Sequence, residues 1–306
     1  MSSVAASIGI AVDRALGEPP ADLHPVASFG TVMRRAETSI YADQRLTGGV
    51  YAAIGVGLGI GAGVVAQRVL GRPLATVLAT AVCAAGRMLD DEARAVADLL
   101  RAGDLDAARG RLRSLVGRNT TELDSSAVSR AVIESLAENG VDAVMSSWWW
   151  AAVGGAPAVL AHRASNTLDA MVGHRNERYR RFGWASARLD DVLNFLPARV
   201  TAAAVAVSRP ARAREVWRTV RRDAAQHPSP NGGVVEAAFA AALGVQLGGA
   251  NRYGDTTEDR GTLGDGRPAH RTDIDRAIRL RRDATTIVGI VGPLIAAAGR
   301  SLVLRR

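Results

Sequence analysis

The residues best suited to chemistry in this chain are carboxylates, amides and arginines that recur at helical spacing between apolar runs. In residues 163–199, Asn166 and Asp169 lie three positions apart, and Asp190 and Asp191 form a second acidic group. Phosphoryl chemistry uses hard oxygen ligands to hold Mg²⁺ and arginines to offset phosphate charge. This stretch therefore predicts the centre of an active site at a membrane surface.

A second group of polar residues follows the loop 117–121. Arg130, Glu134 and Glu138 are spaced four apart, so a helix places them on one face. A helix start with free amides and an arginine is a natural seat for phosphate, and two carboxylates one turn apart can share Mg²⁺. A surface ladder of Arg–Glu pairs has the same spacing and remains an alternative.

Two shorter polar segments are further candidates. The turn 227–233 is rich in Ser, Asn and Gly and enters an apolar run, which predicts a second anion-binding helix start. His24 lies near Asp13 and Glu18 in the sequence, so it is either a structural histidine or part of a site.

Apolar helices must position these groups. The run 47–67 is long enough to span a bilayer, and the run 73–86 would pair with it as a helical hairpin. The run 143–161 holds three tryptophans and a Gly-Gly-Ala-Pro break, which predicts a broken or re-entrant helix. Residues 86–116 have the spacing of amphipathic surface helices, and 252–273 are predicted to be a loop.

The predicted fold class is therefore all-α. We expect a polytopic integral membrane protein with short, partly broken or re-entrant helices and amphipathic surface helices, packed through small residues. Residues 1–306 would form a single helical membrane domain, and the charged segments 87–142 and 162–199 would form its active-site face.

Composition excludes several classes of function. All 38 basic residues are arginine, so the chain has neither the lysine of a P-loop nor that of a Schiff-base enzyme. The single cysteine, Cys83, excludes an intramolecular disulfide and a cysteine metal site. The arginines lie between apolar runs without interleaved aromatics, which indicates cytoplasmic loops and no nucleic-acid partner. The N-terminus lacks the basic region of a cleaved signal peptide.

Short motifs along nearly the whole chain point to one family. They are Gly17-Glu18-Pro19, His24-Pro25-Val26, Gly117-Arg118-Asn119-Thr120, the run 130–139, Asn166-Thr167-Leu168-Asp169, Met171-Val172-Gly173, Asn176-Glu177-Arg178-Tyr179, Asp190-Asp191, Pro197-Ala198-Arg199 and Ser229-Pro230-Asn231. Together they resemble the cobalamin-biosynthesis adenosylcobinamide-phosphate synthase family (CobD/CbiB), whose members are integral membrane proteins. Ala170 and His174 depart from the family pattern, which has Ser and Tyr there.

The resemblance implies an ATP- and Mg²⁺-dependent amide ligation. A carboxyl group of a corrinoid, adenosylcobyric acid, would join the amine of aminopropanol or its phosphate to give adenosylcobinamide or its phosphate. The enzyme would be a multi-pass protein of the cell membrane, in contact with the lipid bilayer, with its active site on the cytoplasmic side. The resemblance does not predict an oligomeric state.

Site roles follow from the resemblance and the residue chemistry together. The residues assigned to catalysis are Glu134, Asp169 and His174, of which Asp169 or His174 would take the proton from the amine. Phosphate and substrate binding is assigned to His24, Arg118, Asn119, Thr120, Arg163, Asn166, Arg175, Arg188, Ser229 and Asn231. The metal ligands are predicted to be Glu138, Asp190 and Asp191.

Two other classes of function have some support. Asn166 to Asp169 and Asp190 to Asn194 faintly resemble diphosphate sites, which would suit a Mg²⁺-dependent intramembrane prenyl- or phospho-alcohol transferase. Glycine-broken helices around charged residues would also suit a transporter. The long charged segments between short apolar runs favour an enzyme.

Overall fold

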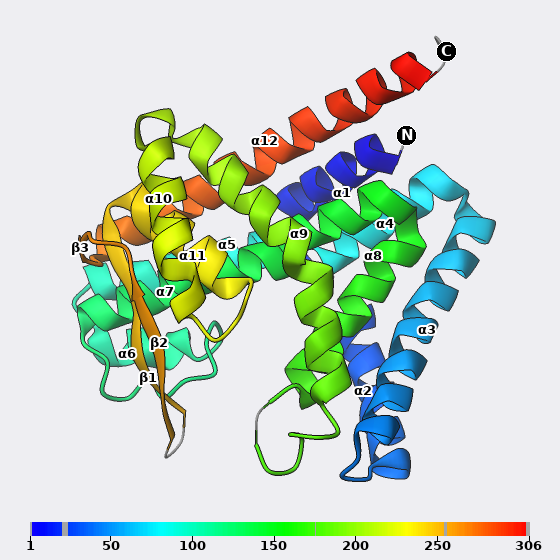
Figure 1. The fold of residues 1–306 in the computed structure, drawn as a ribbon, viewed down its shortest axis with the longest axis horizontal. Helices are drawn as coiled ribbons and strands as arrows, with labels where there is room; N and C mark the ends of the chain where they lie inside the picture. The colour runs from blue at the N-terminus through cyan, green and yellow to red at the C-terminus, as the bar shows by residue number, and fades with distance from the viewer. Residues whose placement is uncertain (1, 20–23, 175, 254–255, 304–306) are drawn as a thin grey trace. The chain divides into compact units, whose positions relative to one another are not determined.

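The computed structural model describes residues 2–19, 24–174, 176–253 and 256–303, and most of these are helical (Figure 1). Contacts divide the chain into two compact units. Unit 1 comprises Met1–Gly86, Asp142–Asn194 and Gly289–Arg306, and unit 2 comprises Arg87–Val141 and Phe195–Val288. The charged segment 87–142 falls almost wholly in unit 2, and the segment 162–199 falls mostly in unit 1. The expectation that the two segments form one active-site face therefore stays a prediction.

Unit 1 is built from helices. They are α1 (Ser2–Leu16), α2 (Pro25–Ile40), α3 (Arg45–Leu70), α4 (Arg72–Cys83), α8 (Ser146–Val172), the start of α9 (Trp184–Ser208) and the end of α12 (Arg271–Val303). The expected helical hairpin is confirmed, because α3 and α4 are joined at Gly71, whose φ of 75° suits glycine. Three stretches of the described residues are long and apolar enough to cross a membrane: Arg45–Leu70, Arg72–Arg101 and Trp184–Ser208.

A stripe of glycines packs α3 against α8, which lies beside it (Figure 1). A Cβ on Gly59 would lie 2.7 Å from the Leu160 carbonyl oxygen, and one on Gly63 would overlap the Pro157 backbone. The opposite face of α3 exposes large apolar side chains such as Leu58 and Val65. Small residues therefore point inward and large apolar ones outward, which is the pattern of helices that pack in lipid.

The expected break in the tryptophan-rich run is confirmed within α8. Gly155 has φ 69° and ψ −153°, a conformation open almost only to glycine, and Pro157 follows inside the same helix. Because Pro157 cannot donate the backbone hydrogen bond that a continuous helix requires there, the chain bends and then resumes its helix through Val172.

Unit 2 adds a small sheet to its helices. The helices are the rest of α9 and α12, α5 (Gly86–Arg101), α6 (Leu105–Leu112), α7 (Ser125–Asn139), α10 (Ala213–Asp223) and α11 (Gly232–Leu243). The strands are β1 (Val245–Tyr253), β2 (Thr256–Leu263) and β3 (Arg267–Pro268) in the order β2-β1-β3. β1 pairs antiparallel with β2 and parallel with β3.

This sheet corrects two sequence expectations. The class is mostly helical with a small sheet and not all-α, and the segment 252–273, predicted to be a loop, contributes to strands. The loop prediction followed its glycines and charges, whereas one of those glycines, Gly261, in fact lies within β2 with φ 68° and packs against Gly248 of β1. Gly248 has φ 79° at a register shift of β1, where a Cβ would collide with the Gly261 carbonyl.

Unit 2 has its core around α11. Every residue of that helix is buried, and it packs against α7, α10 and β1. Asp124 caps α7 by accepting a hydrogen bond from the Ala127 amide at 2.7 Å. The cap fixes where α7 starts and therefore the direction in which its carboxylates point.

Candidate active site

Glu134 on α7 is the centre of a buried ion-pair network in unit 2. One carboxylate oxygen accepts a hydrogen bond from the Arg118 guanidinium. The other accepts one from the Gly248 amide at 2.8 Å and lies 3.8 Å from Arg130 Nε. Arg118 also donates to the Asn251 side chain, and Arg130 donates to the Gly248 carbonyl. These contacts tie α7 to the irregular part of β1.

The predicted phosphate loop beside this network is folded by its own hydrogen bonds. Asn119 Oδ1 accepts from the Thr121 amide at 3.0 Å and from the Thr121 hydroxyl at 2.6 Å. Thr120 is buried, and its hydroxyl lies 3.4 Å from Arg113 Nε. The Thr121 amide is thus already in use, and phosphate binding by Arg118, Asn119 and Thr120 stays a prediction.

Glu138, one turn further along α7, belongs to a different cluster in unit 2. His227 Nε2 lies 3.7 Å from Glu138 Oε1 and 3.4 Å from Glu236 Oε1. One ligand atom from each of these residues fits within 4.8 Å of the other two. The Arg260 guanidinium on β2 lies 3.4 Å from Glu138 and 3.8 Å from Glu236. Glu138, predicted as a metal ligand, is therefore in a group with metal-binding geometry.

Burial changes the protonation chemistry of this cluster. Burial is the main cause that raises the pKa of Glu236 well above its ordinary value, and the like charges of Glu138 and Glu134 add to it. Burial also lowers the pKa of His227, although Glu138 opposes that shift. The cluster therefore combines a neutral imidazole with a carboxyl group that is stable as an anion only beside a cation.

The turn before α11 is closed by the side chain predicted to bind phosphate. Ser229 Oγ accepts hydrogen bonds from the Gly232 amide at 3.1 Å and the Asn231 amide at 3.3 Å. Asn231 Oδ1 accepts one from Arg199 at 2.8 Å. Ser229 thus shapes the start of α11, and Arg199 places a guanidinium group against the same turn.

Unit 1 holds a separate polar network between α8 and α9. The two oxygens of Asp190 accept hydrogen bonds from the Asn166 amide at 3.3 Å and the Asn194 amide at 2.9 Å. Asn194 Oδ1 in turn lies 2.6 Å from Ser146 Oγ and 2.9 Å from His162 Nε2. Neutral amide donors therefore hold the buried Asp190 carboxylate in one orientation.

Other predicted residues surround this network in unit 1. Arg163 donates to Asn166 at 3.4 Å. Asp169 is half-buried on α8 and is close enough to Asp190 and Asp191 to interact with both electrostatically. The side chain of Asp191 is 32% exposed and lies 3.9 Å from Arg188. The structure thus brings Asn166, Asp169, Asp190 and Asp191 together in unit 1.

The remaining predicted residues have weaker structural support. His174 and Arg188 are exposed, and Arg175 lies outside the described residues. His24 caps α2 by accepting a hydrogen bond from the Val26 amide at 3.2 Å, which is a structural role. Its other ring nitrogen lies 3.9 Å from Glu18, whose pKa is raised by burial against the opposing charges of His24 and Arg163.

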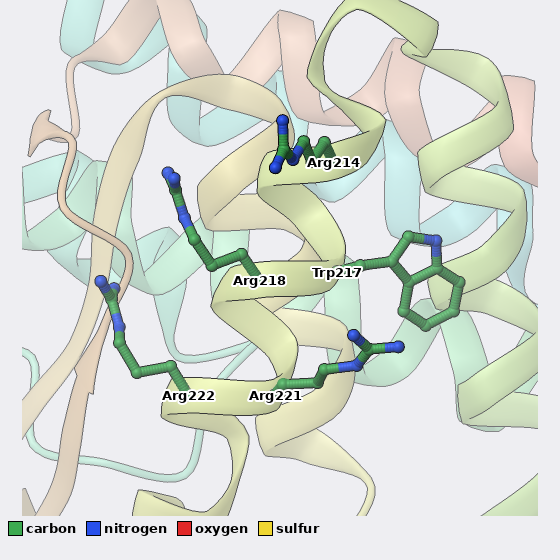
Figure 2. Close-up of a pocket in the computed structure, with 5 residues that line it drawn as sticks. All are labelled: Arg214, Trp217, Arg218, Arg221 and Arg222. Carbon is green, nitrogen blue, oxygen red and sulfur yellow. The ribbon is translucent and has the colours of Figure 1, made fainter.

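A shallow pocket beside α10 contains none of the predicted site residues. Figure 2 shows its lining, in which Arg214, Arg218 and Arg222 project along one side of α10 and Trp217 and Arg221 along the other. The four arginines give this side of the unit a basic surface.

Sequence reasoning missed the functional potential of three residues, His227, Glu236 and Arg260. Glu236 carried a usable signal, because it is the one charged residue in the apolar segment 232–243. A lone carboxylate in such a segment is costly unless something binds it. Arg260 carried no such signal, since only the pairing of β2 brings it to α7 and α11.

Fold and site together define a mostly helical protein with membrane-length apolar helices and buried, carboxylate-rich polar clusters. The family described as CobD/Cbib protein matches residues 6–281. The Cobalamin biosynthesis protein CobD of Mycobacterium tuberculosis is 46% identical over 286 residues, which cover 92% of this chain and 91% of that protein. The chain therefore belongs to the CobD/CbiB family.

Relatives from other bacteria support the same family assignment. The Cobalamin biosynthesis protein CobD of Chromobacterium violaceum is 41% identical over 89% of this chain and 90% of that protein. The protein of the same name in Rhodobacter capsulatus is 39% identical over 94% of this chain and 96% of that protein. No solved structure matches significantly.

Proposed function

We propose that this protein acts in cobalamin biosynthesis as a membrane-embedded, ATP-dependent ligase. It would join a carboxyl group of adenosylcobyric acid to the amine of aminopropanol or its phosphate. The observation that carries the proposal is the family membership, which covers residues 6–281 and therefore the polar clusters of both units. A relative named for cobalamin biosynthesis is 46% identical to this chain over 286 residues.

The chemistry requires activation of a poor electrophile. The carboxylate would take the γ-phosphoryl group of ATP, giving an acyl phosphate and ADP. The amine would then attack the acyl carbon, phosphate would leave, and the nitrogen would lose a proton to a base. Asp169 or His174 is the proposed base, and arginines such as Arg163 would offset the phosphate charge.

Mg²⁺ would accompany ATP and neutralise charge on its phosphates. Such an ion takes most of its ligands from phosphate and water, so it needs only one or two protein carboxylates. Asp191, partly exposed, and the fixed carboxylate of Asp190 fit that requirement. Glu138 was predicted for the same role but lies beside an imidazole, which suits a different ion.

The outward apolar face of α3 supports insertion into a bilayer. The arginines of α10 follow the candidate span Trp184–Ser208 directly in the chain. Arginine-rich segments next to a span are retained in the cytoplasm, and tryptophans favour the interface. We therefore propose the cell membrane as location, with α10 on its cytoplasmic side.

The test is direct reconstitution. Purified protein in detergent would be incubated with adenosylcobyric acid, ATP, Mg²⁺ and either aminopropanol or its phosphate, and the amide would be detected by mass. We expect product that depends on ATP, and comparison of the two amines identifies the natural one. Folded protein that gives no product with either amine would contradict the proposal and favour the transferase or transporter class.

A matched pair of variants locates the site. Asp191→Ala should reduce turnover by at least about 100-fold if its carboxylate helps to hold Mg²⁺ in the transition state. Asp106→Ala removes a similar aspartate, 2.7 Å from an arginine three residues away, but from an exposed position on α6. It should retain full activity. Equal activity of the two variants would remove Asp191 from the site.

A further inference from the structure

We infer that Glu138, His227 and Glu236 form a binding site for one divalent transition-metal ion of the Zn²⁺ type, held by protein ligands alone. The inference concerns metal binding and does not depend on the proposed ligation. The three residues come from α7, the turn before α11 and α11 itself, elements that lie side by side within unit 2 (Figure 1).

Ligand separations favour this class of ion. Zn²⁺ binds imidazole nitrogen and carboxylate oxygen at about 2.0–2.1 Å, so two ligands of a tetrahedral site lie about 3.4 Å apart. His227 Nε2 is 3.4 Å from Glu236 Oε1 and 3.7 Å from Glu138 Oε1. Octahedral Mg²⁺ at about 2.0–2.1 Å would bring neighbouring ligands to about 3.0 Å and prefers oxygen to imidazole.

The buried carboxylate of Glu236 is an independent indication. Its side chain is 0% exposed, and neither of its oxygens has a hydrogen-bond partner among the described residues. Burying a carboxylate without hydrogen bonds is costly, and a directly bound cation removes the cost. Gly232 leaves room for this arrangement, because a Cβ there would lie 2.5 Å from Glu138 Oε1.

His227 has the second contact that metal-binding histidines use. Its Nδ1 accepts a hydrogen bond from the Ser229 amide at 3.0 Å in one tautomer and lies 3.2 Å from the Ser229 carbonyl oxygen, to which it donates in the other. When Nδ1 donates to the carbonyl, Nε2 carries a lone pair toward the two glutamates. Histidine ligands are oriented in this way by a backbone carbonyl or carboxylate on the far nitrogen.

Arg260 competes for the same position. Its guanidinium nitrogen is 3.3 Å from His227 Nε2, 3.4 Å from Glu138 and 3.8 Å from Glu236. A guanidinium and a metal ion cannot both occupy the space between these three atoms. Metal binding therefore requires Arg260 to turn outward, and removing its charge should tighten metal binding. Tighter metal binding after loss of the Arg260 charge would indicate a metal site. A network that serves only to neutralise Arg260 would not bind metal more tightly after that change.

The experiment measures metal directly. Protein without a histidine tag is purified in metal-free buffer with millimolar Mg²⁺, its metal content is determined by mass spectrometry, and the stripped protein is titrated with Zn²⁺ and Co²⁺. We expect one equivalent of Zn²⁺ despite excess Mg²⁺, and a visible Co²⁺ spectrum of low coordination number. Folded wild-type protein that binds no stoichiometric metal would overturn the inference.

Variants assign the site. Glu236→Gln and His227→Gln should each weaken Zn²⁺ binding by at least tenfold, whereas Arg260→Gln should strengthen it. Glu122→Gln and His270→Gln remove the same residue types from exposed positions and should bind like wild type. Retained affinity in Glu236→Gln and His227→Gln would show adventitious surface binding. Unchanged or weaker binding by folded Arg260→Gln would identify Arg260 as the resident cation and overturn the metal site.

Discussion

Two glutamates one turn apart on α7 have different surroundings and therefore differ in their capacity to bind a ligand. Glu134 is 1% exposed and accepts hydrogen bonds from Arg118 and the Gly248 amide, so it binds structural elements together. Glu138 is 31% exposed and faces His227. The first is saturated by protein donors, and the second still has room for a ligand.

The buried pair of Arg118 and Glu134 allows stability to be separated from catalysis. Arg118→Met or Glu134→Leu alone leaves a buried charge without its partner, so each should lower the unfolding free energy by about 3–5 kcal/mol. The double variant should recover most of that loss. Chemical unfolding in detergent measures both effects.

Ligation by the double variant then tests the predicted catalytic role of Glu134. A stable but inactive double variant would support a role for the pair, because Arg118 is itself predicted to bind phosphate. If the protein is stable and active without Glu134, its carboxylate is structural only.

Asp223 makes a pH-dependent contribution to stability. Hydrogen bonds from Arg222 lower the pKa of this carboxyl group, and the Gly264 amide at 2.9 Å adds to the shift against the effect of burial. Because the folded pKa is below the unfolded value of about 3.9, the stabilisation is present above about pH 4 and is lost as pH falls through the folded pKa.

Asp223→Asn should therefore lower the melting temperature at pH 7 by about 2–4 °C, as expected for a loss of about 1 kcal/mol. The difference from wild type should shrink at about pH 3, as thermal unfolding in detergent can show. An equal difference at both pH values would mean that the Asp223 charge is not the cause.

At the scale of elements, the contact of α3 with α8 depends on glycines at every fourth position. Gly55, Gly59 and Gly63 are all buried, and a Cβ on each would meet α8 closely. Gly57 and Gly61 lie between them, and a Cβ on either would meet nothing within 4 Å. A side chain is therefore excluded at positions 55, 59 and 63, whereas positions 57 and 61 have room for one.

Gly59→Ala should destabilise the protein by about 1–3 kcal/mol, since the new methyl group forces the helices apart. Gly61→Ala is the matched control, and it should be neutral or slightly stabilising because alanine favours helix. Thermal unfolding of both variants in the same detergent compares them. Equal stability would contradict close α3–α8 packing.

At the scale of the whole molecule, the central prediction is that both charged segments face one side of the membrane. Asn119 and His174 are exposed within their own units and represent the segments 87–142 and 162–199. In a Cys83→Ala background, cysteines introduced at Asn119 and at His174 should react with an impermeant reagent from the cytoplasmic side only. Labelling in intact cells and inverted vesicles distinguishes the sides.

Labelling of the two positions from opposite sides would exclude a shared active-site face. The broken helix α8 would then cross the bilayer fully instead of re-entering it. A control cysteine at Arg218, on exposed α10, reports the side that the arginine-rich segment occupies.

Local patterns in the sequence determined much of the secondary structure of this protein. Apolar runs predicted α3 and α4, Gly-Gly-Ala-Pro predicted the break in α8, and charge spacing placed Glu134 and Glu138 on one face of α7. These features depend on residues within a few turns of one another, so periodicity and turn chemistry suffice. The order of short motifs also indicated the family, because motif order needs no three-dimensional information.

Only the tertiary structure decided which polar groups meet. Arg260 reaches Glu138 and Glu236 because β2 pairs with β1, and that pairing was hidden by glycines and charges typical of a loop. Asp190 on α9 accepts a hydrogen bond from Asn166 on α8, 24 positions away, and this contact depends on how α9 packs against α8. The contact between Arg260 and Glu138 joins residues 122 positions apart, and no local pattern specifies it.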